Sequence, residues 1–177
     1  AIRICLTQPE IFKTQLRALF RASDYGNIAI MYPMIISVDE VRKIKAISEE
    51  VKEELTKEGI PFGNVEQGIM IETPAAAVMS DDLAKEVDFF SIGTNDLTQY
   101  TMSVDRGNEK VSYLYSTFNP AVLRSIRNII KCGREAGIMV GMCGEAASDP
   151  MMIPLLLAFG LNEFSMSSSA ILKARKM

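Results

Sequence analysis

Two hydrophobic patterns alternate along the chain, short apolar runs and longer segments of helical spacing. The short runs are rich in apolar and β-branched residues, and they lie near residues 2–6, 28–33, 68–72, 88–92, 138–142 and 163–166. Runs of this kind are typical of buried strands. The segments between them predict helices, and in 121–136 the apolar face is formed by Val122, Ile126, Ile129 and Ile130. Strands that alternate with helices predict a parallel α/β fold.

Several helix ends carry recognisable signals. Thr7 with Glu10 and Ser37 with Glu40 fit the capping box, in which a hydroxyl and a carboxylate satisfy the free amides at a helix start. Four glycines stand where a left-handed residue would end a helix before the next strand: Gly26, Gly59, Gly137 and Gly160.

The fold class that we predict is α/β, an incomplete (βα)8 barrel of the TIM type. A doubly wound sheet is the alternative, but no predicted strand is followed by GxGxxG or GxxxxGK[ST]. A closed barrel takes roughly 250 residues, whereas this chain has 177. We therefore expect residues 1–177 to be one partial domain, about strands 3 to 8 with their helices, without the first strands of the barrel.

Composition narrows the classes of partner and of chemistry. The net charge is only −3 and no segment gathers Lys and Arg, so we expect no nucleic acid. The longest apolar run, 151–159, contains Pro154 and is too short for a membrane span. Three widely spaced cysteines indicate a reducing, cytoplasmic compartment. The chain has no histidine, so it holds neither a histidine base nor a phosphohistidine.

Two carboxylates follow predicted strands, where a barrel places functional side chains. Glu72 lies in GIMIETPAA, and Asp96 follows Asn95 in DFFSIGTNDLTQYT. Because all strands of a barrel point the same way, we expect both carboxylates at one mouth. One or two carboxylates with waters and substrate oxygens suit Mg²⁺. A glycosidase pair is the alternative, but the chain has no tryptophan to stack on a sugar.

Two further residues are candidates at the same mouth. Arg106, in VDRGN, could bind a phosphate or carboxylate with two parallel hydrogen bonds, or it could simply pair with Asp105. Cys143 follows another apolar strand, in GIMVGMCGEAA. Its thiol could attack as a thiolate or donate a proton, and the residues alone leave both roles open.

Taken together, ETPAA, DFFSIGTNDLTQYT with DRGN, GMCGEAA and EFSMS resemble the phosphoenolpyruvate-utilising enzyme family over essentially the whole chain. Within it, DRGNEKVSYLY followed by NPAVL is more similar to the Enzyme I branch of the bacterial phosphoenolpyruvate:sugar phosphotransferase system than to the dikinase or synthase branches. The resemblance implies a barrel that binds phosphoenolpyruvate and Mg²⁺ and forms a homodimer. It implies phosphoryl transfer to a protein histidine, release of pyruvate and entry into sugar transport.

The same resemblance implies roles for individual residues. Glu72 and Asp96 match metal ligands, Asn95, Asp96 and Arg106 match substrate contacts, and Cys143 matches the acid that protonates the enolate. The phosphohistidine belongs to a separate N-terminal domain, which would also bind the histidine phosphocarrier protein, so we expect the fragment alone to be inactive. The alternatives are a fragment of a dikinase or synthase, and a non-catalytic dimerisation module.

Overall fold

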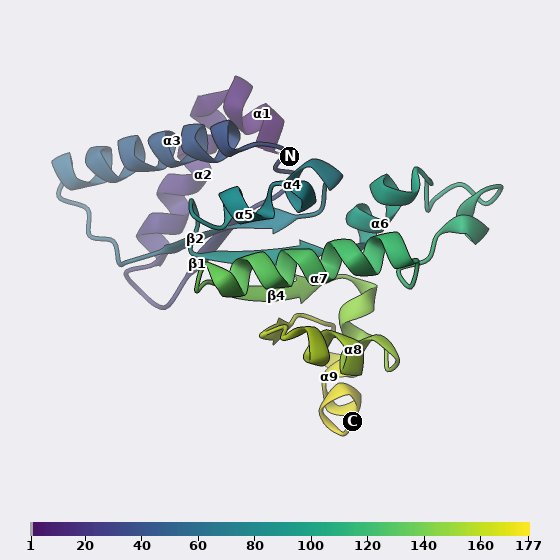
Figure 1. Ribbon diagram of the computed structural model, residues 1–177. Coiled ribbons are helices and arrows are strands. Elements are labelled where there is room, and N and C mark those ends of the chain that lie inside the picture. The colour runs from purple at the N-terminus through teal and green to yellow at the C-terminus, as the bar shows by residue number, and fades with distance from the viewer. Residues whose placement is uncertain (1) are drawn as a thin grey trace.

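The computed structural model describes residues 2–177, in which strands and helices alternate (Figure 1). The strands are β1 (Ala29–Tyr32), β2 (Glu66–Ile71), β3 (Phe89–Gly93), β4 (Met139–Cys143) and β5 (Glu163–Phe164). The α-helices are α1 (Ile2–Thr7), α2 (Pro9–Ala22), α3 (Val38–Lys57), α4 (Pro74–Val78), α5 (Ser80–Leu83), α6 (Thr94–Met102), α7 (Pro120–Glu135), α8 (Met152–Phe159) and α9 (Ser168–Arg175). Two 3₁₀ helices are η1 (Ser112–Leu114) and η2 (Glu145–Ser148).

The five strands form one parallel sheet in the order β1-β2-β3-β4-β5. A doubly wound sheet would reverse its strand order part-way along, whereas this order follows the chain without a reversal. The predicted α/β barrel class is confirmed, with five strands in place of six. Strands β1 and β5 lie at the two edges of the sheet, so the barrel is not closed.

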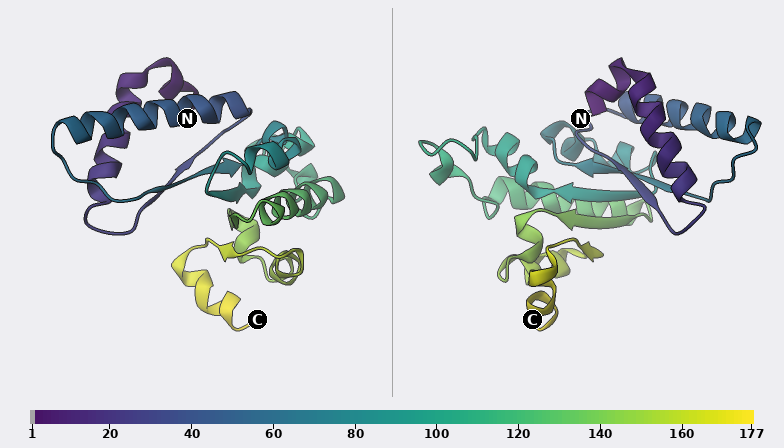
Figure 2. Two further views of the ribbon diagram at one scale, coloured as in Figure 1. Left: turned by 60° about the vertical axis from the view of Figure 1, so that its left-hand side comes forward. Right: turned by 180° about the vertical axis from the view of Figure 1, so that it is seen from behind.

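The core lies between the sheet and the helices on one of its faces. Helix α7 lies along the middle strands (Figure 1), and the view from behind shows these strands in front of it (Figure 2). Alternate strand residues such as Ile69, Phe90 and Val140 are fully buried. On the opposite face, which would line the barrel, Met31 is 38% exposed and Met139 43%. One face of the sheet is therefore packed and the other is partly open.

The predicted strand over 2–6 is wrong, because this segment is helix α1. Its Thr7 hydroxyl donates to the carbonyls of Arg3 and Ile4, and the Gln8 amide continues the helical pattern to Ile4. A short apolar run does not by itself distinguish a strand from a helix. Ile2 is buried while Ile4 is 55% exposed, so the run has no strand-like alternation in its burial.

Some predicted helix ends are confirmed and others are wrong. Ser37 caps α3 by accepting from the Glu40 amide, as predicted. The capping box of Thr7 and Glu10 does not form, since α2 begins after Gln8 with Pro9 in its first turn. Three of the predicted glycines have a positive φ, but Gly26 does not.

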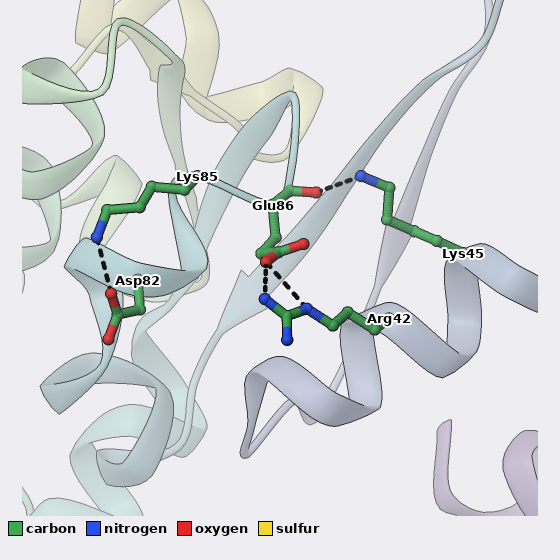
Figure 3. Close-up of polar contacts among 5 residues, drawn as sticks. All are labelled: Arg42, Lys45, Asp82, Lys85 and Glu86. Atoms are coloured by element: carbon green, nitrogen blue, oxygen red, sulfur yellow. Dashed lines mark hydrogen bonds and ion pairs between the residues drawn. The ribbon is translucent and has the colours of Figure 1, made fainter.

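Side chains of α3 reach the segment that follows α5 (Figure 3). Arg42 donates to the Glu86 carboxylate at 2.7 and 3.1 Å, and Lys45 donates to the Glu86 carbonyl at 2.6 Å. Lys85, in that segment, pairs with Asp82 of α5. Exposed pairs of this kind contribute little stability, on the order of 0–1 kcal/mol, so the position of α3 depends mainly on its buried face.

Within residues 2–177, every helix is either too short or too polar to cross a bilayer.

Candidate functional site

The ends of β2, β3 and β4 bring the predicted site residues to one edge of the sheet. Glu72 follows β2 directly, Asp96 lies in the first turn of α6 after β3, and Cys143 ends β4. Gly93 is paired with Cys143 in the register. A Cβ on Gly93 would lie 2.9 Å from Glu72 Oε2, so the absence of a side chain there gives the Glu72 carboxylate its space. The expectation of a shared mouth is thus met for these residues.

Glu72 is a buried carboxylate with a second carboxylate beside it. Glu72 is 5% exposed, and its Oε1 accepts from the Met34 amide at 2.7 Å. Burial raises the pKa of Glu72, the neighbouring Asp96 raises it further, and the Met34 hydrogen bond opposes both. Two carboxylates this close need a positive charge nearby when both are ionised.

The Met34 amide reaches Glu72 because the backbone turns sharply after β1. Met34 has a φ of 59°, a left-handed conformation that is uncommon for a residue other than glycine. The next carbonyl, of Ile35, accepts from the Thr73 hydroxyl at 2.7 Å. The turn is therefore anchored to the segment just after Glu72. Pro33 signals a turn in the sequence, but nothing there identifies Met34 as the donor.

Arg106 comes to the site from the loop that follows α6. Its Nη2 lies 3.6 Å from Asp96 Oδ1, and its amide donates to Gln99 Oε1 at 3.0 Å. Asp105 accepts instead from the Gly107 amide, so the alternative pairing of Arg106 with Asp105 is wrong. The guanidinium is 44% exposed and Asp96 30%, which leaves donors free for a ligand.

Cys143 has a half-buried thiol whose pKa is raised, which favours its protonated form. Burial is the main reason that its pKa is raised, and the Glu72 and Glu163 carboxylates add to this effect. The Ser91 hydroxyl on β3 partly opposes it. A protonated thiol can donate a proton but is a poor nucleophile. The surroundings therefore favour the first of these two roles, proton donation.

The first turn of α6 presents backbone donors beside these side chains. Helix α6 starts after Gly93 without a side-chain cap, so its first amides are available to an anion. The Asn95 carbonyl accepts from the Tyr115 hydroxyl at 3.2 Å. Thr94 is different, because its hydroxyl is buried and donates to the Cys143 carbonyl at 3.2 Å. We therefore assign it no hydroxyl contact with a ligand.

The donor set suits a cation that keeps water in its shell. Among residues 2–177, no cluster of three or more His, Cys, Asp or Glu side chains is placed to hold a metal. Glu72 and Asp96 nevertheless face each other, and the latter is partly open to solvent. Mg²⁺ is commonly bound by one or two carboxylates together with waters and phosphate oxygens, so these residues fit it better than a metal that needs a full protein shell.

Comparisons with known proteins place the chain in a family. The family model of the phosphoenolpyruvate-utilising enzymes, phosphoenolpyruvate-binding domain, matches residues 1–177. The chain belongs to the phosphoenolpyruvate-utilising enzyme family. It is 59% identical to the phosphoenolpyruvate-protein phosphotransferase of Geobacillus stearothermophilus over 99% of this chain and 30% of that protein. For the protein of that name from Bacillus subtilis, the identity is 58% over 99% of this chain and 31% of the relative. The chain thus spans less than a third of these relatives.

Solved structures that superpose on the chain are less similar to it in sequence than these relatives are. A citrate lyase from Burkholderia xenovorans superposes with a TM-score of 0.67 at 21% identity, over 92% of this chain and 53% of that one. An aldolase/citrate lyase family protein from Burkholderia cenocepacia superposes with a TM-score of 0.64 at 16% identity, over 96% of this chain and 67% of that one. Both support a TIM-barrel-like fold for this family member and nothing about its chemistry.

One charged residue near the mouth escaped the sequence reasoning. Arg3, on α1, lines a cavity of about 350 Å³ together with Met34, Thr73 and Tyr100. The mistaken strand over 2–6 hid it, since a helix there turns this side chain toward the segments after β1 and β2. In this family member, α1 thus contributes to the surroundings of the site.

Proposed function

We propose that the chain is the phosphoenolpyruvate- and Mg²⁺-binding part of a phosphoenolpyruvate-protein phosphotransferase, which moves phosphate to a protein histidine and releases pyruvate. The observation that carries the proposal is the meeting of Glu72, Asp96 and Cys143 at the ends of adjacent strands, with Arg106 brought to Asp96 from the loop after α6. The names of the relatives support it over a dikinase or synthase.

Glu72 and Asp96 would hold the Mg²⁺, which supplies positive charge to the phosphate oxygens when bound. Glu72 is fixed by the Met34 amide at 2.7 Å, so one of its oxygens is oriented before any ligand arrives. Asp96 is more exposed and is free to meet a cation from the solvent side. This division gives one rigid and one adaptable ligand.

Arg106, Asn95 and the first amides of α6 would bind the phosphate. The guanidinium offers several donors to an anion, and α6 directs uncapped amides toward the same place. As the phosphorus–oxygen bond breaks, the enolate oxygen keeps the electron pair and the phosphoryl group passes to a histidine nitrogen outside this chain. These donors stabilise the charge during that transfer.

Cys143 would complete the reaction by donating its proton to the methylene carbon of the enolate. The carbon–hydrogen bond that forms gives pyruvate, and the sulfur is left as a thiolate that solvent reprotonates. The raised pKa of the thiol keeps the proton in place until it is needed.

Phosphoenolpyruvate is the proposed small-molecule partner, and the histidine phosphocarrier protein would receive phosphate by way of the histidine domain. The proposal includes a cytoplasmic homodimer that serves the first step of sugar phosphotransferase transport. Nucleic acid and membrane are not proposed as partners, in line with the mild charge of −3.

Two substitutions in the full-length enzyme test the proposal. Asp96→Asn should abolish the Mg²⁺ dependence of phosphoenolpyruvate binding in calorimetry, whereas Asp24→Asn, an exposed position outside the site, should retain it. Cys143→Ala should still bind phosphoenolpyruvate but lower pyruvate formation by about 10²-fold or more. Mg²⁺-dependent binding that survives Asp96→Asn would refute the metal assignment, and unchanged turnover in Cys143→Ala would refute the acid.

A further inference from the structure

Two contacts join the turn after β3 to the turn after β4, and the proposed reaction uses neither of them. The Thr94 hydroxyl donates to the Cys143 carbonyl at 3.2 Å. Asn95 Oδ1 accepts from the Glu145 amide at 3.4 Å. Thr94 itself is 0% exposed, so its hydroxyl has no contact with solvent. The first turn of α6 holds Asn95, a proposed phosphate contact, and the turn after β4 directly follows Cys143. These two hydrogen bonds connect the two turns directly.

The fit between the two turns depends on Gly144. Its φ is 99°, a conformation that strongly favours glycine. A Cβ at this position would lie 2.5 Å from Thr94 Oγ1 and 3.2 Å from Asn95 Oδ1. The turn after Cys143 therefore lies directly against Thr94 and Asn95, with no side chain between them.

These contacts set two features of the mouth. Because the Asn95 oxygen already accepts a bond, its amide NH₂ group is the part left to donate to a phosphate. Because the Cys143 carbonyl is held by Thr94, the main chain that carries the thiol is fixed relative to the first turn of α6. A displacement of about 1 Å can lower a reaction rate by about 10²-fold, so the spacing of the two turns matters for proton donation.

We propose that Thr94 is a positioning residue that holds Cys143 at a fixed distance from the phosphate contacts. The inference rests on the proposed function, since it assumes that Cys143 delivers the proton. It predicts that Thr94 affects the protonation step and leaves the binding of phosphoenolpyruvate nearly unchanged.

The test compares Thr94→Val, Thr94→Ser and Thr98→Val in the full-length enzyme. Valine keeps the shape of threonine and removes the hydroxyl, so kcat for pyruvate formation should fall about tenfold with KM for phosphoenolpyruvate changed less than twofold. Thr94→Ser should restore kcat. Thr98 is the matched control, because it is equally buried in α6 and its hydroxyl has no hydrogen-bond partner among the described residues.

A second readout does not depend on turnover. Iodoacetamide should alkylate Cys143 several-fold faster in Thr94→Val than in Thr98→Val, as measured by mass spectrometry of the peptide that contains it. The proposal would be overturned if Thr94→Val had the same kcat and the same rate of Cys143 alkylation as the parent enzyme. An equal loss in both valine variants, or a parallel rise of KM, would also overturn it. The failure of the proposed function would look different. Cys143→Ala would then keep its turnover, while Cys143 would still be alkylated faster in Thr94→Val than in Thr98→Val.

Discussion

Glu72 is a carboxylate whose charge the fold makes costly. It is buried, it faces Asp96, and a single backbone amide offsets part of this cost. Residues in such surroundings are often functional, because a bound ligand can supply what the protein lacks. The position of Glu72 after a predicted strand identifies it in the sequence. The cost of its charge depends on Met34, in the turn after β1, and on Asp96, in the first turn of α6.

Glu72→Gln should raise the stability of this domain at neutral pH. The folded-state pKa of Glu72 lies above its ordinary value, so the parent binds more protons when folded and loses stability as pH rises from about 4.3. The variant has no such loss, so the stabilities of the parent and the variant should become equal below about pH 4. Thermal midpoints of the full-length protein at several pH values measure the difference.

Glu66→Gln, an exposed change at the start of β2, is the control and should show no such trend. Excess Mg²⁺ should stabilise the parent more than Glu72→Gln, since a ligand that binds only the folded state raises its stability. If the thermal midpoints of the parent and Glu72→Gln differed by the same amount at pH 4 and pH 8, this account would be contradicted.

Sequence patterns predict the residues of the site better than the contacts between them. Glu72, Asp96 and Cys143 could be placed at one edge because a parallel barrel aligns its strand ends. The Met34 amide and the Thr94 hydroxyl could not, since one depends on a positive φ at a methionine and the other on the register between β3 and β4. Contacts of this kind appear only when distant segments are paired.

Among the secondary structure elements, long periodic segments were predicted correctly and the short run at the start was not. Helix α7 buries the four predicted apolar residues, because sixteen residues give the helical period several turns in which to repeat. Residues 2–6 give barely one turn, so composition suggested a strand where packing favours helix α1. Helix ends divide in the same way, since Gly137 has the predicted left-handed conformation and Gly26 does not.

Gly137→Ala and Gly26→Ala form a matched pair that tests this difference. At both glycines an added Cβ would have no neighbouring atom within 4 Å, so crowding affects neither change. Gly137 has a φ of 76° at the end of α7, and alanine there should cost about 1 kcal/mol. Gly26→Ala should be neutral or stabilising by up to about 1 kcal/mol.

Urea unfolding of the two variants beside the parent measures both values. Equal midpoints for Gly137→Ala and Gly26→Ala would show that the backbone conformation at 137 does not matter to stability.

Taken as a whole, residues 2–177 form an open sheet with two unpaired edges and a partly bare inner face, the face that would line the barrel. Strands β1 and β5 each have one neighbour, and Met31 and Met139 on the inner face are more than a third exposed. Unpaired edges and apolar surface favour association between chains. The order of the strands could be inferred from the alternation of elements, whereas the extent of closure depends on how many strands the chain supplies.

The 177-residue chain on its own should therefore self-associate at micromolar concentrations, as sedimentation velocity would show. Met31→Lys places a charge on the inner face at the β1 edge and should reduce association. Met151→Lys makes the same change at a residue that is 78% exposed outside the sheet, and it should not. Monomeric behaviour of the parent, or an equal effect of both lysines, would contradict this prediction.

The hydrogen bond from Met34 to Glu72 has a consequence for how the family can vary. Its donor belongs to the main chain, so most side chains at this position supply the same N–H group, and only proline lacks it. The left-handed backbone there favours glycine or asparagine over β-branched residues. Natural variants should thus keep the N–H donor through many changes of residue 34, with glycine and asparagine favoured and proline excluded. A hydrogen bond to Glu72 can therefore persist at a position whose side chain is not conserved.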